Sequence, residues 1–148
     1  METGIEQKET FCAEETFSLG KRLGEQAKPG EIYCLDGELG TGKTVLTQGF
    51  GVGLGVREPV NSPTFTIVQV YEEGRLPLYH FDVYRICDPS EMDEIGYEDY
   101  FFGGGVCLVE WASLMEELIP EEAVWIRIEK DLEQGCDYRR IIMERHKE

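Results

Sequence analysis

The hydrophobic positions of this chain form short runs and periodic stretches that predict alternating helices and strands. In residues 14–27, apolar side chains recur at steps of three and four, and Pro29-Gly30 ends the pattern, which is typical of a helix. The apolar segment at residues 31–35 predicts a buried strand. A second helix is expected to begin at Lys43 and to break among the three glycines at Gly51, Gly53 and Gly55.

The rest of the chain predicts more strands than helices. Residues 64–71 and 76–84 are rich in β-branched and aromatic side chains and flank a turn-like segment, so they predict an antiparallel hairpin. The continuous apolar run at 106–109 is typical of a strand buried on both faces. Two short helices are also expected, one at residues 88–95 and one that ends at residue 119. Two strands with alternating apolar and polar residues are expected at 123–128 and 139–143. The expected sheet is therefore mixed.

Length, composition and charge narrow the class of protein. The chain has 148 residues, of which 41% are hydrophobic, and no linker divides it, so we expect a single domain over residues 1–148. A net charge of −16 without any basic run argues against direct binding to nucleic acid, because that affinity depends on clustered Lys and Arg. The acidic clusters are interpreted as a solvated surface, with a docking face for a basic partner as the alternative.

Cysteine usage and hydropathy indicate a cytoplasmic protein. The five cysteines are odd in number and widely spaced, without a Cys-x-x-Cys pair for zinc or a secretory leader, so free thiols are expected. The longest apolar runs are far shorter than a membrane span, and no membrane association is expected.

A phosphate-binding motif follows the first predicted strand. Residues 37–44 read Gly-Glu-Leu-Gly-Thr-Gly-Lys-Thr, which matches G-x-x-x-x-G-K-[ST] in full. Glycines let main-chain N–H groups turn toward phosphate oxygens, and the N-terminus of the next helix adds a favourable dipole. Lys43 would then neutralise the β and γ phosphates, and Thr44 would ligate Mg²⁺. The motif predicts a nucleoside triphosphate site, and a flexible glycine turn with a solvated lysine is the alternative.

Acids at strand ends supply further candidates. Ligands of open α/β sheets lie beyond the carboxyl ends of strands, where Glu110 is placed like an acid that holds Mg²⁺. A strand period of two puts His80 and Asp82 on one face, so Asp82 could orient water or support Mg²⁺ with His80 as its partner. A structural Asp-His or Asp-Arg pair is the alternative. Ser62-Pro63-Thr64 suits a switch-like contact to the γ-phosphate, but a plain turn is the better explanation of these residues alone.

Taken together, these motifs resemble the TsaE family. The resemblance rests on the phosphate-binding loop, Ser62-Pro63-Thr64-Phe65, the segment His-Phe-Asp-Val-Tyr-Arg at 80–85, and Val109-Glu110-Trp111, in this order along nearly the whole chain. One departure is Glu38, where the family usually has Asp, and this change keeps the charge. The resemblance implies an α/β fold of the P-loop NTPase type, with three layers and a mixed, partly antiparallel central sheet.

The resemblance also implies an activity, cofactors and partners. It implies a P-loop ATPase that uses ATP and Mg²⁺ and works with TsaB and TsaD to form N6-threonylcarbamoyladenosine at position 37 of tRNAs that read ANN codons. The tRNA would be contacted only through the complex. Hydrolysis by the isolated protein is expected to be slow, because the sequence shows no clear arginine finger.

Residue roles follow from the same resemblance. Catalytic roles are implied for Lys43, Asp82 and Glu110, and magnesium ligation for Thr44 and Glu110. Nucleotide contacts are implied for Gly37, Glu38, Leu39, Gly40, Thr41, Gly42, Lys43, Thr44, Thr64, Trp111 and Arg139. For Trp111, a buried core position is the alternative.

Two other functions are compatible with the loop. A small nucleotide or metabolite kinase uses the same motif, although such kinases close an arginine-rich lid and the arginines here are scattered. The third hypothesis is a non-catalytic module that binds nucleotide only to dock a partner. Hydrolysis without any added acceptor separates the ATPase from both.

Overall fold

One sheet of seven strands organises the chain, in the order β1-β7-β6-β2-β5-β4-β3. The computed structural model describes residues 2–37, 42–61, 67–84, 86 and 88–147. The strands are β1 (Glu2–Thr10), β2 (Ile32–Gly37), β3 (Val68–Tyr71), β4 (Leu78–Asp82), β5 (Val106–Glu110), β6 (Val124–Lys130) and β7 (Arg139–Lys147). The helices are α1 (Ala13–Gln26), α2 (Lys43–Leu54), α3 (Ser90–Glu94) and α4 (Tyr97–Phe101), with 3₁₀ turns η1 (Ala112–Leu118) and η2 (Leu132–Gln134).

The sheet is mixed, as the sequence predicts. Strands β4, β5, β2 and β6 are parallel neighbours, so their carboxyl ends meet at one edge. Strands β3, β7 and β1 pair antiparallel with their neighbours on the two sides. All five residues of β5 are buried, which confirms the interpretation of the apolar run as a strand covered on both faces.

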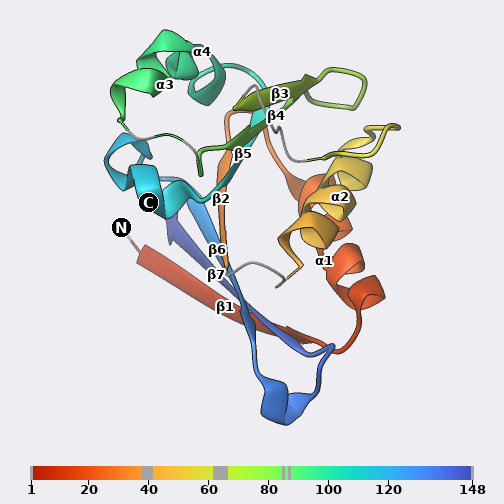
Figure 1. Cartoon of the computed structure of the whole chain (residues 1–148). Helices are drawn as coiled ribbons and strands as arrows, with labels where there is room; N and C mark the ends of the chain where they lie inside the picture. The colour runs from red at the N-terminus through yellow and green to blue at the C-terminus, as the bar shows by residue number, and fades with distance from the viewer. Residues whose placement is uncertain (1, 38–41, 62–66, 85, 87, 148) are drawn as a thin grey trace.

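Helices cover both faces of this sheet, which confirms the expected three-layer α/β fold. Figure 1 shows α1 and α2 on one side of the sheet and α3, α4 and η1 on the other. Alternate residues of β2 divide between two cores, because Tyr33 and Leu35 pack with the α1–α2 layer whereas Cys34 packs with the opposite layer.

Helices α1 and α2 pack through glycines that let their main chains approach closely. The buried positions of α1 are Thr16, Leu19, Gly20, Leu23 and Gly24, at the spacing of one helix face. A Cβ atom added at Gly24 would lie 2.2 Å from the Phe50 carbonyl oxygen of α2. In return, a Cβ atom at Gly53 of α2 would lie 2.1 Å from the Lys21 carbonyl oxygen of α1. The glycine run is therefore a helix-packing surface.

The end of α2 confirms the expected break among the glycines. Low helix propensity predicts a break at Gly51, Gly53 or Gly55, and the helix continues through Gly51 and Gly53 to Leu54. It ends at Gly55, whose φ of 91° is the left-handed conformation that glycine adopts without strain. Tertiary packing thus outweighs the local propensity of the first two glycines.

Other elements differ from the sequence-based predictions in extent. The antiparallel hairpin is confirmed, but its strands are shorter than expected, and residues 64–66 of the predicted first strand lie outside the described ranges. The chain leaves the sheet after Asp82, whose carboxylate accepts a hydrogen bond from the Tyr84 N–H. Strand β1 and helix α4 were not predicted, because β1 is largely polar and Gly96 was taken as the end of a helix.

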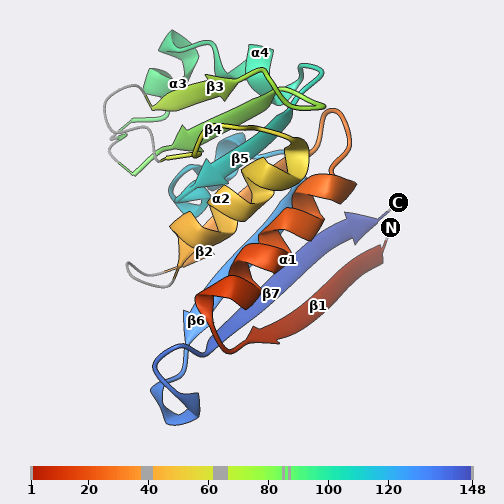
Figure 2. The same cartoon turned by 90° about the vertical axis from the view of Figure 1, so that its right-hand side faces the viewer.

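The first and last described residues lie side by side. Glu2 pairs with Lys147 at the end of the antiparallel β1–β7 ladder, and Figure 2 shows both chain ends there. Since β7 begins at Arg139, near the carboxyl end of β6, this corner of the sheet is opposite the carboxyl ends of the parallel strands. In the described parts of the chain, no helix combines the length and apolar character that crossing a membrane requires.

The close approach of α1 and α2 leads to a stability prediction. Gly53→Ala should lower the free energy of unfolding by about 1–3 kcal/mol, because overpacking against main-chain atoms outweighs the gain of about 1 kcal/mol in helix propensity. Urea denaturation measures the change. Gly104→Ala is the control, since a Cβ atom there meets nothing within 4 Å. A Gly53→Ala protein as stable as the control would contradict this account of the interface.

Candidate functional site

The parallel register brings the predicted strand-end acids together. Asp82 pairs with Glu110 between β4 and β5, and Glu110 pairs with Leu35 between β5 and β2. Paired residues of neighbouring strands point to the same face, and Leu35 packs in the α1–α2 core, so both carboxylates point toward the α2 layer. Lys43 is the first residue of α2 and follows β2 through the phosphate-binding loop. The predicted site residues Glu38, Leu39, Gly40, Thr41 and Thr64 lie outside the described residues.

Lys43 is a buried cation for which the described residues offer no hydrogen-bond acceptor. Its side chain belongs to a residue that is 7% exposed, and within the described structure its Nζ has no hydrogen-bond partner. The amine instead lies over the indole of Trp111, 3.4 Å from the ring centroid, which is a cation–π contact. Such a contact leaves the N–H donors of the amine available to an anion.

Burial and the neighbouring carboxylates shift the pKa of Lys43 in opposite directions. Burial lowers the pKa of the Lys43 amine, whereas the nearby carboxylates of Glu110, Asp82 and Asp36 raise it. Burial also raises the pKa of Asp82, against the hydrogen bond from the Tyr84 N–H, and the Glu110 carboxylate raises it further. The three carboxylates therefore lie close enough to Lys43 to interact with its charge.

Glu110 is paired with His80, which corrects one sequence-based expectation. The distance from His80 Nε2 to Glu110 Oε2 is 2.6 Å, and His80 and Glu110 are 0% and 4% exposed. Spacing along β4 suggested Asp82 as the partner of His80, but His80 reaches across to the neighbouring strand β5. The other ring nitrogen, Nδ1, lies 3.1 Å from the main-chain oxygen of Asn61.

Trp111 reaches Lys43 through an unusual backbone conformation. Its φ is 64°, in the left-handed region that costs a non-glycine residue on the order of 1–3 kcal/mol. The Trp111 N–H donates to the Leu35 oxygen at 3.2 Å, which anchors this turn at the end of β2. The structure thus places the Trp111 ring beside the Lys43 amine.

The remaining described residues of the predicted site surround the start of α2. Gly42 is the N-cap of α2 with a φ of 96°, Thr44 is exposed in the first helical turn, and Gly37 is the last residue of β2. Arg139 lies at the start of β7, and its Nη1 donates to the main-chain oxygens of Cys136 and Tyr138. A pocket lies at the start of α2, between this helix, α1 and the start of β7. It is lined by Ala13, Thr16, Gly42, Val45, Asp137 and Arg139.

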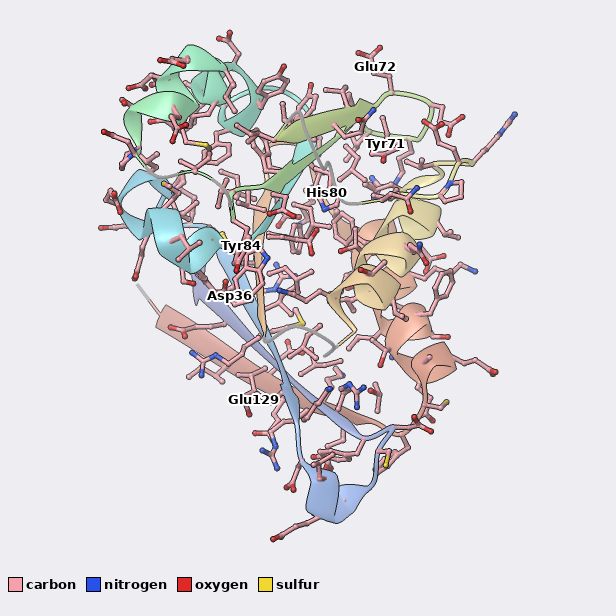
Figure 3. All side chains as sticks on the ribbon, viewed as in Figure 1. Asp36, Tyr71, Glu72, His80, Tyr84 and Glu129 are labelled. Atoms are coloured by element: carbon pink, nitrogen blue, oxygen red, sulfur yellow. The ribbon has the colours of Figure 1, made fainter. Side chains whose placement is uncertain are left out.

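Two residues near this site were missed by sequence reasoning. Asp36 directly precedes the phosphate-binding loop, is one of the acids that act on Lys43, and accepts a hydrogen bond from Ser113 Oγ at 3.2 Å. The ring of Tyr84 lies 4.8 Å from that of Trp111 between centroids and is 56% exposed. Figure 3 labels Asp36, His80 and Tyr84, which come from β2, β4 and the turn after β4. An acid at the tip of β2 was the available signal for Asp36.

The described side chains hold no cluster of three or more His, Cys, Asp or Glu residues suited to a metal ion. A hydroxyl and a carboxylate can contribute only part of the coordination shell of Mg²⁺. This ion usually keeps several waters and binds through one or two carboxylates together with phosphates of the substrate. The two magnesium ligands that the resemblance implies, Thr44 and Glu110, would therefore suit a metal that arrives with a phosphate ligand.

Comparison with protein families gives a match over most of the chain. Residues 11–141 match the family model described as "Threonylcarbamoyl adenosine biosynthesis protein TsaE". A relative from Bacillus subtilis, named tRNA threonylcarbamoyladenosine biosynthesis protein TsaE, is 52% identical over 132 residues, which are 89% of this chain and 80% of the relative. A relative of the same name from Treponema pallidum is 39% identical over 116 residues, 78% of this chain and 85% of the relative.

A solved structure agrees with these matches. The fold is similar to the crystal structure of YdiB from Bacillus subtilis, with a TM-score of 0.80 and 41% sequence identity. The similarity covers 98% of this chain and 88% of the other chain.

The buried amine of Lys43 leads to a prediction about stability without nucleotide. Lys43→Met should raise the free energy of unfolding by about 1 kcal/mol, because an apolar side chain of similar length removes a buried donor without a partner. Guanidinium denaturation in nucleotide-free buffer measures this. Lys21→Met, at an exposed position of α1, should change stability by less than about 0.5 kcal/mol. A loss of stability in Lys43→Met would show that the cation–π contact outweighs the burial of the charge.

Proposed function

The chain belongs to the TsaE family, and from that premise we propose that it binds and hydrolyses Mg-ATP in the formation of N6-threonylcarbamoyladenosine at position 37 of tRNAs that read ANN codons. The observation that carries the proposal is the buried amine of Lys43, held among carboxylates at the end of a complete phosphate-binding loop. Within the described structure the N–H donors of this cation are unused, and such a cation is suited to an anionic ligand.

The residues present fit a bound nucleoside triphosphate. The Lys43 Nζ has no acceptor among the described residues, so phosphate oxygens would satisfy donors that burial leaves unpaired. Gly42 has a positive φ, and a Cβ atom there would meet nothing within 4 Å, so its main chain is open to a ligand. Beside it lies the pocket that includes Val45 and Arg139.

Each residue then has a distinct task in the proposed reaction. Bound Mg-ATP would supply the γ-phosphoryl group, with the metal neutralising part of its charge. Lys43 and the main-chain N–H groups of the loop would hold phosphate oxygens, and Thr44 and Glu110 would hold Mg²⁺. Asp82 orients the attacking water, a task that suits a carboxylate at a strand end beside Glu110.

The charge of the chain favours a division of labour with partner proteins. A net charge of −16 is unsuited to a tRNA, whose phosphates require clustered basic residues. We therefore place tRNA on TsaB and TsaD within a cytoplasmic complex, with this chain contributing the nucleotide site. Without an arginine finger of its own, the isolated protein is expected to turn over slowly.

Hydrolysis without an acceptor tests the enzymatic part of this proposal. Glu110→Gln and Asp82→Asn should bind ATP nearly as wild type does but lose turnover by roughly 10²-fold or more, because their carboxylates act on the metal and the water rather than on nucleotide affinity. Release of ADP and phosphate is measured beside calorimetric binding. Strict dependence on a small-molecule acceptor would instead indicate a kinase, and wild-type turnover in either variant would remove the role assigned to that acid.

Reconstitution tests the assignment to tRNA modification. With TsaB, TsaD and tRNA present, multiple-turnover formation of threonylcarbamoyladenosine should require this chain and should stop in Lys43→Ala, which cannot hold the phosphates. Mass spectrometry of digested tRNA measures the product. Product formation that proceeds equally well without this chain would remove the tRNA assignment and leave the nucleotide site intact.

A further inference from the structure

His80 is fully buried and uses both ring nitrogens. It is 0% exposed, and it contacts the Glu110 carboxylate through Nε2 at 2.6 Å and the Asn61 main-chain oxygen through Nδ1 at 3.1 Å. Buried polar groups are almost always hydrogen-bonded, so these two contacts account for the hydrogen-bonding capacity of the ring. His80 therefore links the end of β5 to the chain segment that follows α2.

The two contacts differ in what they demand of the ring. A carbonyl oxygen only accepts hydrogen bonds, so Nδ1 carries a hydrogen and donates it to Asn61. The Nε2···Oε2 contact with Glu110 contains a second hydrogen, which belongs to the ring or to the carboxyl group. The Asn61 contact thus fixes the orientation of the imidazole, and the imidazole in turn fixes the rotation of the Glu110 carboxylate.

The main-chain N–H of Asn61 is held by the side chain of Tyr71. The Asn61 N–H donates to the Tyr71 hydroxyl at 3.3 Å, and Val60, next to it, is 2% exposed in the α1–α2 core. In Figure 3, Tyr71 and His80 are labelled on the two strands of the β3–β4 hairpin. The acceptor for Nδ1 is therefore part of the packed framework, and the orientation of His80 does not depend on solvent.

Resting on the function proposed above, we propose that His80 is a positioning residue that aims the Glu110 carboxylate at the metal of the nucleotide. His80 itself touches neither nucleotide nor metal; it acts through the carboxylate that it holds. Partners of metal-binding carboxylates and imidazoles set ligand orientation, and their loss commonly reduces metal affinity or activity by roughly 10–100-fold. If His80 had only a structural role, its substitutions would act through packing and stability. A variant that kept the Glu110 hydrogen bond would then behave like one that kept the Asn61 hydrogen bond.

Two amide substitutions separate the positioning role from packing. The amide nitrogen of His80→Gln can reach the place of Nε2 and keep the donor toward Glu110, whereas that of His80→Asn can replace Nδ1 and keep only the donor toward Asn61. Both remove the aromatic ring from the same core position. Gln69→Ala serves as the control, because Gln69 is the exposed cross-strand partner of His80 in β3.

Three quantities are measured in each variant: ATP turnover, calorimetric affinity for ADP without metal, and Mn²⁺ affinity of the ADP-bound protein by electron paramagnetic resonance. His80→Asn should lower turnover and Mn²⁺ affinity by roughly 10–100-fold, whereas His80→Gln should stay within about fivefold of wild type. Affinity for ADP without metal should change by less than about threefold in both variants. Thermal unfolding confirms that both proteins are folded in the assay.

The outcomes distinguish this inference from the function on which it rests. If the Gln and Asn variants had equal Mn²⁺ affinity and turnover, or if His80→Gln lost more of either, the positioning role would be overturned. Turnover by the wild-type protein in the same assay would still support the ATPase function. A wild-type protein that takes up no ADP would overturn the proposed function and the role of His80 together.

Discussion

The parallel hydrogen-bond register of β4, β5 and β2 is the constraint on which the site depends. It fixes Asp82 beside Glu110 and Glu110 beside Leu35, so two carboxylates and the start of the phosphate-binding loop come to one edge of the sheet. A one-residue slip in this register would turn each side chain to the opposite face. Burial of β5 on both faces makes such a slip costly, because it would exchange core and site residues.

Around this edge, the structure concentrates features that stability alone would not favour. A lysine is buried without an acceptor in the described structure, and a tryptophan adopts a left-handed backbone. Burial and the nearby Glu110 carboxylate raise the pKa of Asp82. Local conflicts of this kind are expected at functional sites, where the surrounding fold compensates for them. Here the close contact of α1 with α2 and the two packed cores provide that compensation.

The sequence allowed the mixed sheet and the strand-end acids to be predicted, because loop motifs and apolar runs are local signals, whereas the three layers were implied by the family resemblance. Glu110 was found because β5 is a continuous apolar run, and Trp111 because of its place in a family motif. The partner of His80 could not be found, since a period of two gives the face of a residue but not which neighbouring strand supplies its contact. The sequence predicted that α2 ends among three glycines but not at which one, because helix propensity is local, whereas the fit of Gly53 against α1 is tertiary. Strand β1 escaped notice because its polar sequence carries a weak periodic signal.

The pairing of Glu2 with Lys147 has a consequence for how this molecule can be re-engineered. Because Glu2 and Lys147 are direct partners on neighbouring strands, a short peptide could join β1 to β7 without bending the sheet, so the order of elements along the chain is separable from their arrangement in space. A circularly permuted chain, opened at an exposed turn such as the one between β6 and β7, would keep every strand neighbour. Fusion partners attached at this corner would likewise extend away from the edge where the parallel strands end.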